Sequence, residues 1–474
     1  MNDSSTSSHI SDPAPLLRRD SLSRFGLYAR CISSERGKSS MNTVTAAVPV
    51  NTLLSRYGFR ASDLVTPDSS YGALLDRALH EAGIGLDELP SISEQDWQLA
   101  LRKARDRFDG PGGETLVDPR RAPLPLSSID FYMAGVVRWM NELGIHTYSC
   151  CDGHGKRLPH ANMISYLGTQ QKHILQVSAP EGMSLRAQGR RVQWEMNPSE
   201  PERLLQFAER LYCIVSEPAT LFRYEADRFA EGLVELLEIP GESGSEERIR
   251  RAAIAKLRRH ADDLFVDRAG NVCAAILCGE GPTVLLSAHM DVFSEIEPER
   301  RIVRRGTELS SSEGILGADD RAGMAVILEL CRRVHRTNFN GTLKVALTVR
   351  EEIGLEGSQA LDAAWLEDVR GAIVVDRRGT RDIVTSCGRV IPFCSEAYGR
   401  LFEAAGALAG MPDWRVTPGG SSDAKVLATE FGIPSVNLSA GYRHEHTSSE
   451  TVDYLATYQT VKLIECVLHR NMIQ

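Results

Sequence analysis

The sequence contains neither a long hydrophobic run nor a dense pattern of cysteines. Among its 474 residues, no uninterrupted apolar segment approaches the about 18 residues that a membrane-spanning helix needs. The ten cysteines are scattered and include no CxxC pair, which argues against a scaffold built on disulfides. Such usage is typical of a reducing compartment, so we expect a cytoplasmic protein with no membrane partner.

An excess of positive charge is also missing. Lysine and arginine number 54 against 63 aspartates and glutamates, which gives a formal net charge of -9. An acidic chain repels phosphate backbones and anionic lipids, and we therefore expect no nucleic-acid partner. With 42% hydrophobic and 25% charged residues, the composition is that of a globular protein long enough for two or three domains.

The first 44 residues lack the apolar core of a secretory signal and are rich in serine. We interpret residues 1–44 as a disordered tail. Met41 is an alternative to Met1 as the start site. Acidic residues within this tail argue against an organelle transit peptide.

Residues 45–215 are predicted to form a helical and α+β domain. Glycine and proline are frequent over 109–126, as in a linker or a long surface loop. Apolar periodicity predicts helices over 70–84, 94–108, 130–145 and 201–215, and short strands over 146–151, 161–168, 173–179 and 190–196. No family resemblance is found in this half, so its role stays open; a protein partner or self-association through residues 45–215 is one hypothesis.

One short segment of this domain, SCCDGHGKRLPH, concentrates potential metal ligands. It contains Cys150, Cys151, Asp152, His154 and His160. Vicinal cysteines are poorly placed to bind one zinc ion together, and no second ligand pair stands at the usual spacing. The sequence therefore favours a glycine-containing turn with incidental polar residues over a metal or thiol site.

From residue 219 onward, predicted helices and strands alternate. The predicted strands cover 264–266, 272–277, 283–289, 342–349, 371–376 and 433–440, and the predicted helices cover 229–239, 246–261, 320–334, 395–410 and 451–469. Alternation of this kind is typical of a mixed, mostly parallel sheet covered by helices on both faces. We expect residues 219–474 to form a three-layer α/β/α domain.

Charged or ligating side chains follow four of these strands, where open α/β sheets place their chemistry. Clustered carboxylates repel one another unless a cation compensates their charge. A crevice with two histidines and several carboxylates therefore predicts a divalent metal site, with zinc as the first choice. The residues concerned are His289 and Asp291, Glu351 and Glu352, Asp376, His444 and His446, together with Asp319 and Asp320 at the start of a helix.

Several of these segments resemble the co-catalytic dizinc exopeptidases, the clan of aminopeptidases, tripeptidases, aminoacylases and related carboxypeptidases. The resemblance rests on His289-Met290-Asp291, the LGADDRAG turn, EEIGLEGS, the Asp376 that closes VVD, and HTSSE at 446–450. It covers about residues 219–468. The short segments 291–319 and 376–446 leave no room for the inserted domains of some branches, so the domain is similar to that of monomeric aminopeptidases, although ILGADDRAG is closer to the tripeptidase branch.

The resemblance implies a role for each of these residues. His289 and Asp376 would hold one Zn²⁺ and Glu352 and His446 a second, with Asp319 bridging both; Co²⁺ or Mn²⁺ could replace zinc. Asp291 would orient His289. Glu351 would act as the general base. A cis peptide bond is implied at Asp319-Asp320, and His446 is preferred to His444 as the ligand.

The expected activity is hydrolysis of an amide bond in a small peptide or amino-acid conjugate, with an aminopeptidase as the first hypothesis. A free α-amino group would then bind near one zinc and a carboxylate such as Asp320 or Asp423. Recognition of a substrate carboxylate by Arg377, Arg378 or Arg443 would instead favour a dipeptidase or an N-acyl amino acid amidohydrolase. A non-catalytic binding module of the same fold ranks last, because all five ligand positions and the base are present.

Overall fold

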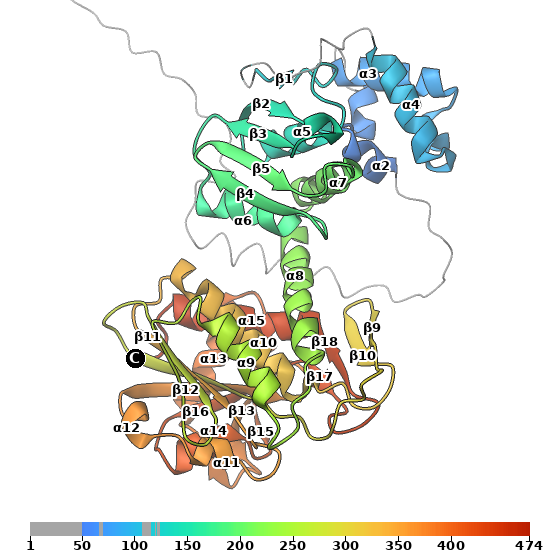
Figure 1. Cartoon of the computed structure of the whole chain (residues 1–474). Coiled ribbons are helices and arrows are strands. Elements are labelled where there is room, and N and C mark those ends of the chain that lie inside the picture. The colour runs from blue at the N-terminus through green and yellow to red at the C-terminus, as the bar shows by residue number, and fades with distance from the viewer. Residues whose placement is uncertain (1–49, 66–69, 107–114, 119, 121–123) are drawn as a thin grey trace, which may run out of the picture. The chain divides into compact units, whose positions relative to one another are not determined.

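The computed structural model describes residues 50–65, 70–106, 115–118, 120 and 124–474. The expected tail over residues 1–44 lies outside these residues. The described chain divides into two compact units between Tyr224 and Glu225, within helix α8 (Thr220–Leu237) (Figure 1). No helix in the described part of the chain combines the length and apolarity needed to cross a membrane.

The amino-terminal unit contains a five-stranded antiparallel sheet in the order β1-β2-β3-β5-β4. Its strands are β1 (Thr115–Leu116), β2 (Thr147–Cys151), β3 (His160–Met163), β4 (Ser184–Gln188) and β5 (Arg191–Glu195). In β5 the apolar residues alternate with polar ones, so that Val192 and Trp194 are buried and their neighbours are not. This period of two is the pattern of a strand with one face against a core.

Helices complete the amino-terminal unit. They are α2 (Val50–Arg56), α3 (Ser70–Ala82), α4 (Glu94–Arg105), α5 (Ala134–Glu142), α6 (Thr169–Ser178) and α7 (Glu202–Ser216), with 3-10 turns at Ala61–Val65, Leu86–Ser91 and Gly153–Gly155. Trp97, Trp139 and Trp194 are fully buried in one apolar core that draws on all of these helices. The indole of Trp139 donates to the carbonyl of Ser55 at 2.7 Å. The unit therefore has a hydrophobic core of its own.

The strand predicted over 173–179 is wrong, because α6 occupies this segment. Ile174, Leu175, Val177 and Ser178 are buried, a spacing that also fits one face of a helix. The Gln171 side chain accepts from the backbone N–H of Gly168 at 3.0 Å and so stabilises the first turn. Three apolar positions in a short segment could not distinguish a strand from a helix, and β4, which the sequence did not reveal, lies just beyond it.

The carboxy-terminal unit is built on a nine-stranded mixed sheet in the order β14-β13-β16-β12-β8-β11-β7-β6, with β15 paired to β13. Strands β16, β12, β8 and β11 at its centre are parallel. The strands are β6 (Asp263–Val266), β7 (Val272–Leu277), β8 (Thr283–His289), β11 (Thr342–Thr348), β12 (Val369–Arg377), β13 (Asp382–Cys387), β14 (Ile391–Pro392), β15 (Arg415–Gly419) and β16 (Ser435–Ser439). All seven residues of β8 are buried, as expected for a strand covered on both faces.

Helices cover both faces of this sheet, which confirms the predicted three-layer architecture (Figure 1). One face carries α9 (Glu247–Leu257), α10 (Ala318–Arg333), α13 (Glu396–Leu408) and α15 (Tyr454–His469), and the other α11 (Glu356–Gln359), α12 (Ala363–Leu366) and α14 (Asp423–Thr429). A short 3-10 turn, Val334–Arg336, follows α10. Helix α10 packs against β8 and β12 and begins at the carboxyl ends of these strands.

A second, four-stranded antiparallel sheet was not predicted. It contains β9 (Ile302–Arg305), β10 (Glu308–Ser311), β17 (Tyr442–Arg443) and β18 (Thr451–Asp453). These strands have two to four residues, too few for a periodic pattern to emerge in the sequence. The loop between β17 and β18 carries His446, so this small sheet positions one of the expected ligands.

Candidate active site

The parallel strands bring the predicted site residues to one edge of the large sheet. β8 lies between β11 and β12, and His289 at the end of β8 pairs in register with Thr348 at the end of β11. Glu351 and Glu352 follow β11, and Asp376 lies near the end of β12. His289 is therefore flanked by the glutamate pair on one side and by Asp376 on the other.

Asp319 lies between the two predicted histidine ligands. Its Oδ1 is 3.1 Å from Nε2 of His289, and its Oδ2 is 3.3 Å from Nε2 of His446. Each histidine also meets a further carboxylate, since His289 Nε2 lies 3.6 Å from Asp376 Oδ1 and His446 Nε2 lies 2.9 Å from Glu352 Oε1. The five predicted ligands thus form one cluster. Asp319 lies at its centre, with the pair His289–Asp376 on one side and the pair His446–Glu352 on the other.

Asp291 follows β8 by two residues and contacts the cluster through His289. Its Oδ1 is 3.4 Å from Nδ1 of His289, the ring nitrogen on the far side from Asp319. The backbone carbonyl of Asp291 lies closer to the same nitrogen, at 3.0 Å. Oδ1 and the backbone carbonyl oxygen of Asp291 thus both face Nδ1 of His289. This nitrogen would carry the proton if Nε2 bound a metal.

The peptide bond between Asp319 and Asp320 is cis, as predicted. Helix α10 begins at this point, and the Asp320 Oδ1 accepts the backbone N–H of Gly323 at 2.9 Å. Asp320 is fully buried, and its Oδ2 has no hydrogen-bond partner among the described residues. One oxygen of Asp320 also lies within 4.8 Å of ligand atoms of His289 and Asp376.

The electrostatics of the cluster are those of several carboxylates buried close together. Burial raises the pKa of Asp376 to about 6, that of Glu352 to about 7 and that of Glu351 to about 9, and nearby carboxylates add to each increase. A hydrogen bond with Asp319 raises the pKa of His446 to about 9.

Asp319 itself behaves differently. Burial opposes its ionisation, but hydrogen bonds with His289 and His446 outweigh burial and lower its pKa.

These observations fit a divalent metal site. The donors are imidazole nitrogens and carboxylate oxygens, the set that zinc takes in hydrolytic centres. A cation would relieve the repulsion that raises the pKa of Glu352 and Asp376, and it would compensate the buried Asp320 oxygen. Two overlapping groups of ligand atoms meet the distance requirement for an ion: His289, Asp319 and Glu352, and His289, Asp320 and Asp376.

Four further residues that were not predicted as site residues contact the cluster or Asp291. The hydroxyl of Tyr442 donates to Asp376 Oδ1 at 3.0 Å, and the ring of Phe293 stacks on that of His446 with centroids 4.2 Å apart. Glu450 accepts the backbone N–H groups of Gly317 and Asp319 at 2.7 and 3.0 Å, and Ser243 donates to Asp291 at 2.7 Å. Of these, only Glu450 had a possible cue, since it is the final residue of HTSSE.

Two of the three arginines considered for substrate recognition have partners within the chain. Arg377 pairs with Asp382 at 3.2 Å, and Arg378 pairs with Glu445 at 2.7 Å. The fully buried Asp423 accepts hydrogen bonds from Thr348 and Ser287 through Oδ2. Asp423 is therefore held between β8 and β11, and its Oδ1, like Oδ2 of Asp320, has no hydrogen-bond partner among the described residues.

Comparison with known proteins gives several similar proteins and structures. A Bacillus subtilis protein, YqjE, is 31% identical over 153 residues, which are 29% of this chain and 40% of the relative. A protein of Acetivibrio thermocellus named "Putative aminopeptidase" is 23% identical over 48% of this chain and 94% of its own length. The crystal structure of aminopeptidase PepT from Bacillus cereus superposes with a TM-score of 0.46 at 18% identity, over 52% of this chain and 98% of that chain.

The matched region of the first of these relatives is less than half of its length, so the match concerns a part of each protein. The described cluster lies within residues 271–469, which match the model of peptidase family M28. Residues 271–469 of this chain are therefore similar to the metallopeptidases of peptidase family M28.

Proposed function

We propose that the protein is a dizinc aminopeptidase that removes the amino-terminal residue from small peptides. One observation carries the proposal: the two oxygens of Asp319 face two different histidines, at 3.1 Å from His289 and 3.3 Å from His446. A carboxylate shared in this way between two imidazoles is suited to bridge two ions. A single ion would need only one of these oxygens.

The ligand assignment follows from the second carboxylate that each histidine meets. His289 and Asp376 would hold one ion, His446 and Glu352 the other, and Asp319 both. When bound, a pair of zinc ions supplies Lewis-acid polarisation of the scissile carbonyl and makes water more acidic. Asp291, through its carboxylate and its carbonyl, would keep the proton of His289 on Nδ1 and leave Nε2 available.

Glu351 is the proposed general base. Its burial and the nearby charges of Asp376 and Asp423 raise its pKa to about 9. Two cations bound beside it would lower this pKa, so that the carboxylate could be ionised near neutral pH and take a proton. In the proposed reaction the Glu351 carboxylate takes a proton from the attacking water. It then donates this proton to the nitrogen of the leaving amine as the amide bond breaks.

The choice of a substrate with a free α-amino group rests on the charge of the site. Carboxylates outnumber the histidines in the cluster, and the Asp320 oxygen without a partner adds to this excess. An ammonium group can pair with a carboxylate that the proposed ions do not use, such as Asp320, whereas a substrate carboxylate would need a cationic side chain or one of the ions. Arg377 and Arg378 are already paired with acidic residues, and the named aminopeptidase among the relatives agrees with this choice.

The test uses the full chain reconstituted with zinc and a matched set of substrates. Aminoacyl p-nitroanilides and dipeptides should be cleaved, the same compounds with acylated amino groups should not, and a chelator should abolish the activity reversibly. Cleavage of the acylated compounds alone would replace the proposal with an N-acyl amino acid amidohydrolase. Absence of hydrolysis with two bound ions per cluster would reject the proposed activity.

A further inference from the structure

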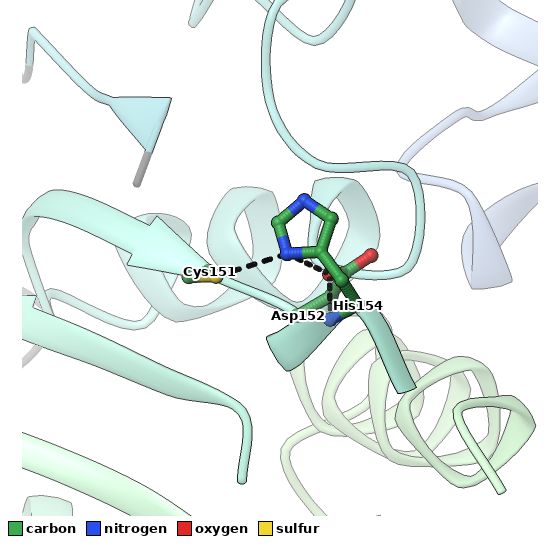
Figure 2. A group of neighbouring side chains, drawn as sticks. All are labelled: Cys151, Asp152 and His154. Carbon is green, nitrogen blue, oxygen red and sulfur yellow. Dashed lines mark hydrogen bonds and ion pairs between the residues drawn. The ribbon is translucent and has the colours of Figure 1, made fainter. Parts of the chain in front are cut away.

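A second group of metal-ligand atoms lies in the amino-terminal unit, outside the family match. Sγ of Cys151, a carboxylate oxygen of Asp152 and a ring nitrogen of His154 all lie within 4.8 Å of one another. Cys151 ends strand β2, and the other two residues belong to the turn that follows. Figure 2 shows the His154 ring with one nitrogen facing both the Cys151 sulfur and the Asp152 carboxylate.

Cys150 and Cys151 lie in strand β2, so the proposed site does not require both adjacent cysteines to bind one ion. Consecutive side chains of a strand point to opposite faces of the sheet. Cys150 is fully buried in the apolar core, whereas Cys151 is partly exposed. Only Cys151 therefore takes part in the cluster.

The distances within the cluster match the edges of a zinc tetrahedron. His154 Nδ1 lies 3.6 Å from Cys151 Sγ and 3.5 Å from Asp152 Oδ1. Zinc bonds of ~2.3 Å to sulfur and ~2.0–2.2 Å to nitrogen and oxygen, at tetrahedral angles, place sulfur and nitrogen about 3.6 Å apart and nitrogen and oxygen about 3.4 Å apart. Two of the three edges thus already have the spacing for one ion, and the third, between Sγ and the carboxylate oxygen, is at most 4.8 Å.

The local backbone holds the donors in this arrangement. The turn contains Gly153, His154 and Gly155 in succession at positive φ, a conformation that glycine adopts easily and histidine rarely. Asp152 Oδ1 accepts the backbone N–H of His154 at 2.8 Å, which fixes the carboxylate. The backbone N–H of Gly153 lies 3.4 Å from Cys151 Sγ and points to it as a donor, which favours the thiolate form that a metal binds.

We propose that Cys151, Asp152 and His154 bind a divalent zinc-like ion, as a metal site separate from the peptidase cluster. Thiolate, imidazole and carboxylate are the three donor types that zinc takes in proteins. Three protein donors with water in the fourth position are the arrangement of zinc sites that exchange a ligand, in contrast to closed structural sites with four. The surrounding core contains 43 buried residues among those that the structure describes.

Cobalt(II) provides a test that distinguishes this site from the peptidase cluster. A thiolate bound to cobalt gives a sulfur-to-metal charge-transfer band in the near ultraviolet, and the residues of the peptidase cluster contain no sulfur. Reduced, metal-free full-length protein titrated with cobalt should show this band and should bind one ion more than the Cys151→Ser variant. The outcome is independent of the proposed peptidase activity.

A matched control is Cys278, whose Sγ lies 3.7 Å from Nδ1 of His335 in the other unit. The Cys278→Ser variant should keep the band, whereas Cys151→Ser and His154→Ala should lose it. Asp152→Asn can still accept from the His154 backbone and should weaken cobalt binding at least about tenfold. Circular dichroism checks that each variant is folded. A wild-type protein without the band, or a band that survives in Cys151→Ser, would overturn the proposal.

Discussion

The carboxylate of Asp291 accepts the backbone N–H of Glu351 at 3.0 Å. Its second oxygen accepts the backbone N–H of Glu352 at 3.2 Å and the hydroxyl of Ser243 at 2.7 Å. Burial opposes ionisation of Asp291, but hydrogen bonds from His289 and Ser243 outweigh burial and lower its pKa to about 2. One buried carboxylate therefore fixes the turn that presents both glutamates and also faces His289.

Replacing this carboxylate should disturb the metal site although Asp291 is not a proposed ligand. Asp291→Asn places a donating NH₂ group among groups that all donate, so at least one hydrogen bond is lost. We expect zinc affinity to fall about 10–100-fold, the range typical for residues that orient a ligand. Competition with a zinc chelator measures this. Ser243→Ala removes one of the donors to Asp291 and should lower zinc affinity less. An equal loss of affinity would contradict the conclusion that the Asp291 carboxylate holds the site in place.

Glu351→Gln separates proton transfer from metal binding. The amide has nearly the shape of the carboxylate but cannot accept the proton, and we expect kcat to fall by about 10²–10⁴-fold while metal content stays unchanged. Glu356→Gln is the control in the same turn, since Glu356 pairs with Arg350 at 2.7 Å and is exposed. Loss of metal in Glu351→Gln would show that Glu351 is a ligand and not the base.

Glu352→Gln, unlike Glu351→Gln, should change metal binding. Glu352 Oε1 lies 2.9 Å from His446 Nε2, and its removal leaves that half of the cluster with one carboxylate fewer. We expect one ion to bind much more weakly while the other, held by His289 and Asp376, is retained. Isothermal titration calorimetry with zinc should then resolve a single tight site in place of two. Two tight sites in this variant would remove Glu352 from the ligand set.

Two glycines in helices should respond to alanine in opposite ways. A Cβ at Gly323 in α10 would lie well under 3.0 Å from the carbonyl oxygen of Val375 and from the Asp320 carboxylate. Gly323→Ala should therefore displace α10 from β12, destabilise the protein by about 1–3 kcal/mol and weaken metal binding. A Cβ at Gly232 in α8 meets nothing within 4 Å, so Gly232→Ala should stabilise by about 0.5–1 kcal/mol. Urea unfolding measures both.

The buried Glu465 in α15 should make stability depend on pH. Burial opposes its ionisation, but the charges of Arg333, 3.1 Å away, and of Lys462 outweigh burial and lower its pKa to about 2 from 4.5. Because the pKa is lower in the folded state, this carboxylate stabilises the fold above about pH 4.5, and its contribution is lost as the pH falls towards 2.

Compared with wild type, Glu465→Gln should lose about 3–5 kcal/mol of unfolding free energy at pH 7, because the buried Arg333 and Lys462 lose a carboxylate that both of them contact. The difference should shrink as the pH falls below about 4.5. Urea unfolding at pH 7, 5 and 3.5 with a chelator present measures it. The exposed Glu247→Gln on α9 serves as the control; its ion pairs with Arg250 and Arg251 are screened by solvent, so its dependence on pH should be much smaller. A difference that is constant with pH would contradict the assignment.

Long and strongly patterned segments allowed the carboxy-terminal fold to be predicted. All of β8 is buried, as are residues 343–348 of β11 and 371–375 of β12, and a polar or ligating residue marks the end of each strand. In the amino-terminal unit the segments were shorter, and α6 was mistaken for a strand because three apolar residues fit both periods. The four strands of the small sheet were missed because each has only two to four residues, too few to show a period.

The sequence by itself determined which chemical groups are present and in what order, because metal ligands and a proton acceptor are set by residue type. It also placed His289, Glu351, Glu352 and Asp376 at the ends of strands, since parallel strands must bring their carboxyl ends together. Only the tertiary structure decided that Asp319 lies between two histidines and that Asp291 holds the glutamate turn. It likewise decided that Cys151 and His154 converge while Cys150 turns into the core. Distances of this kind depend on strand register and on positive-φ turns, which local patterns of residue types do not encode.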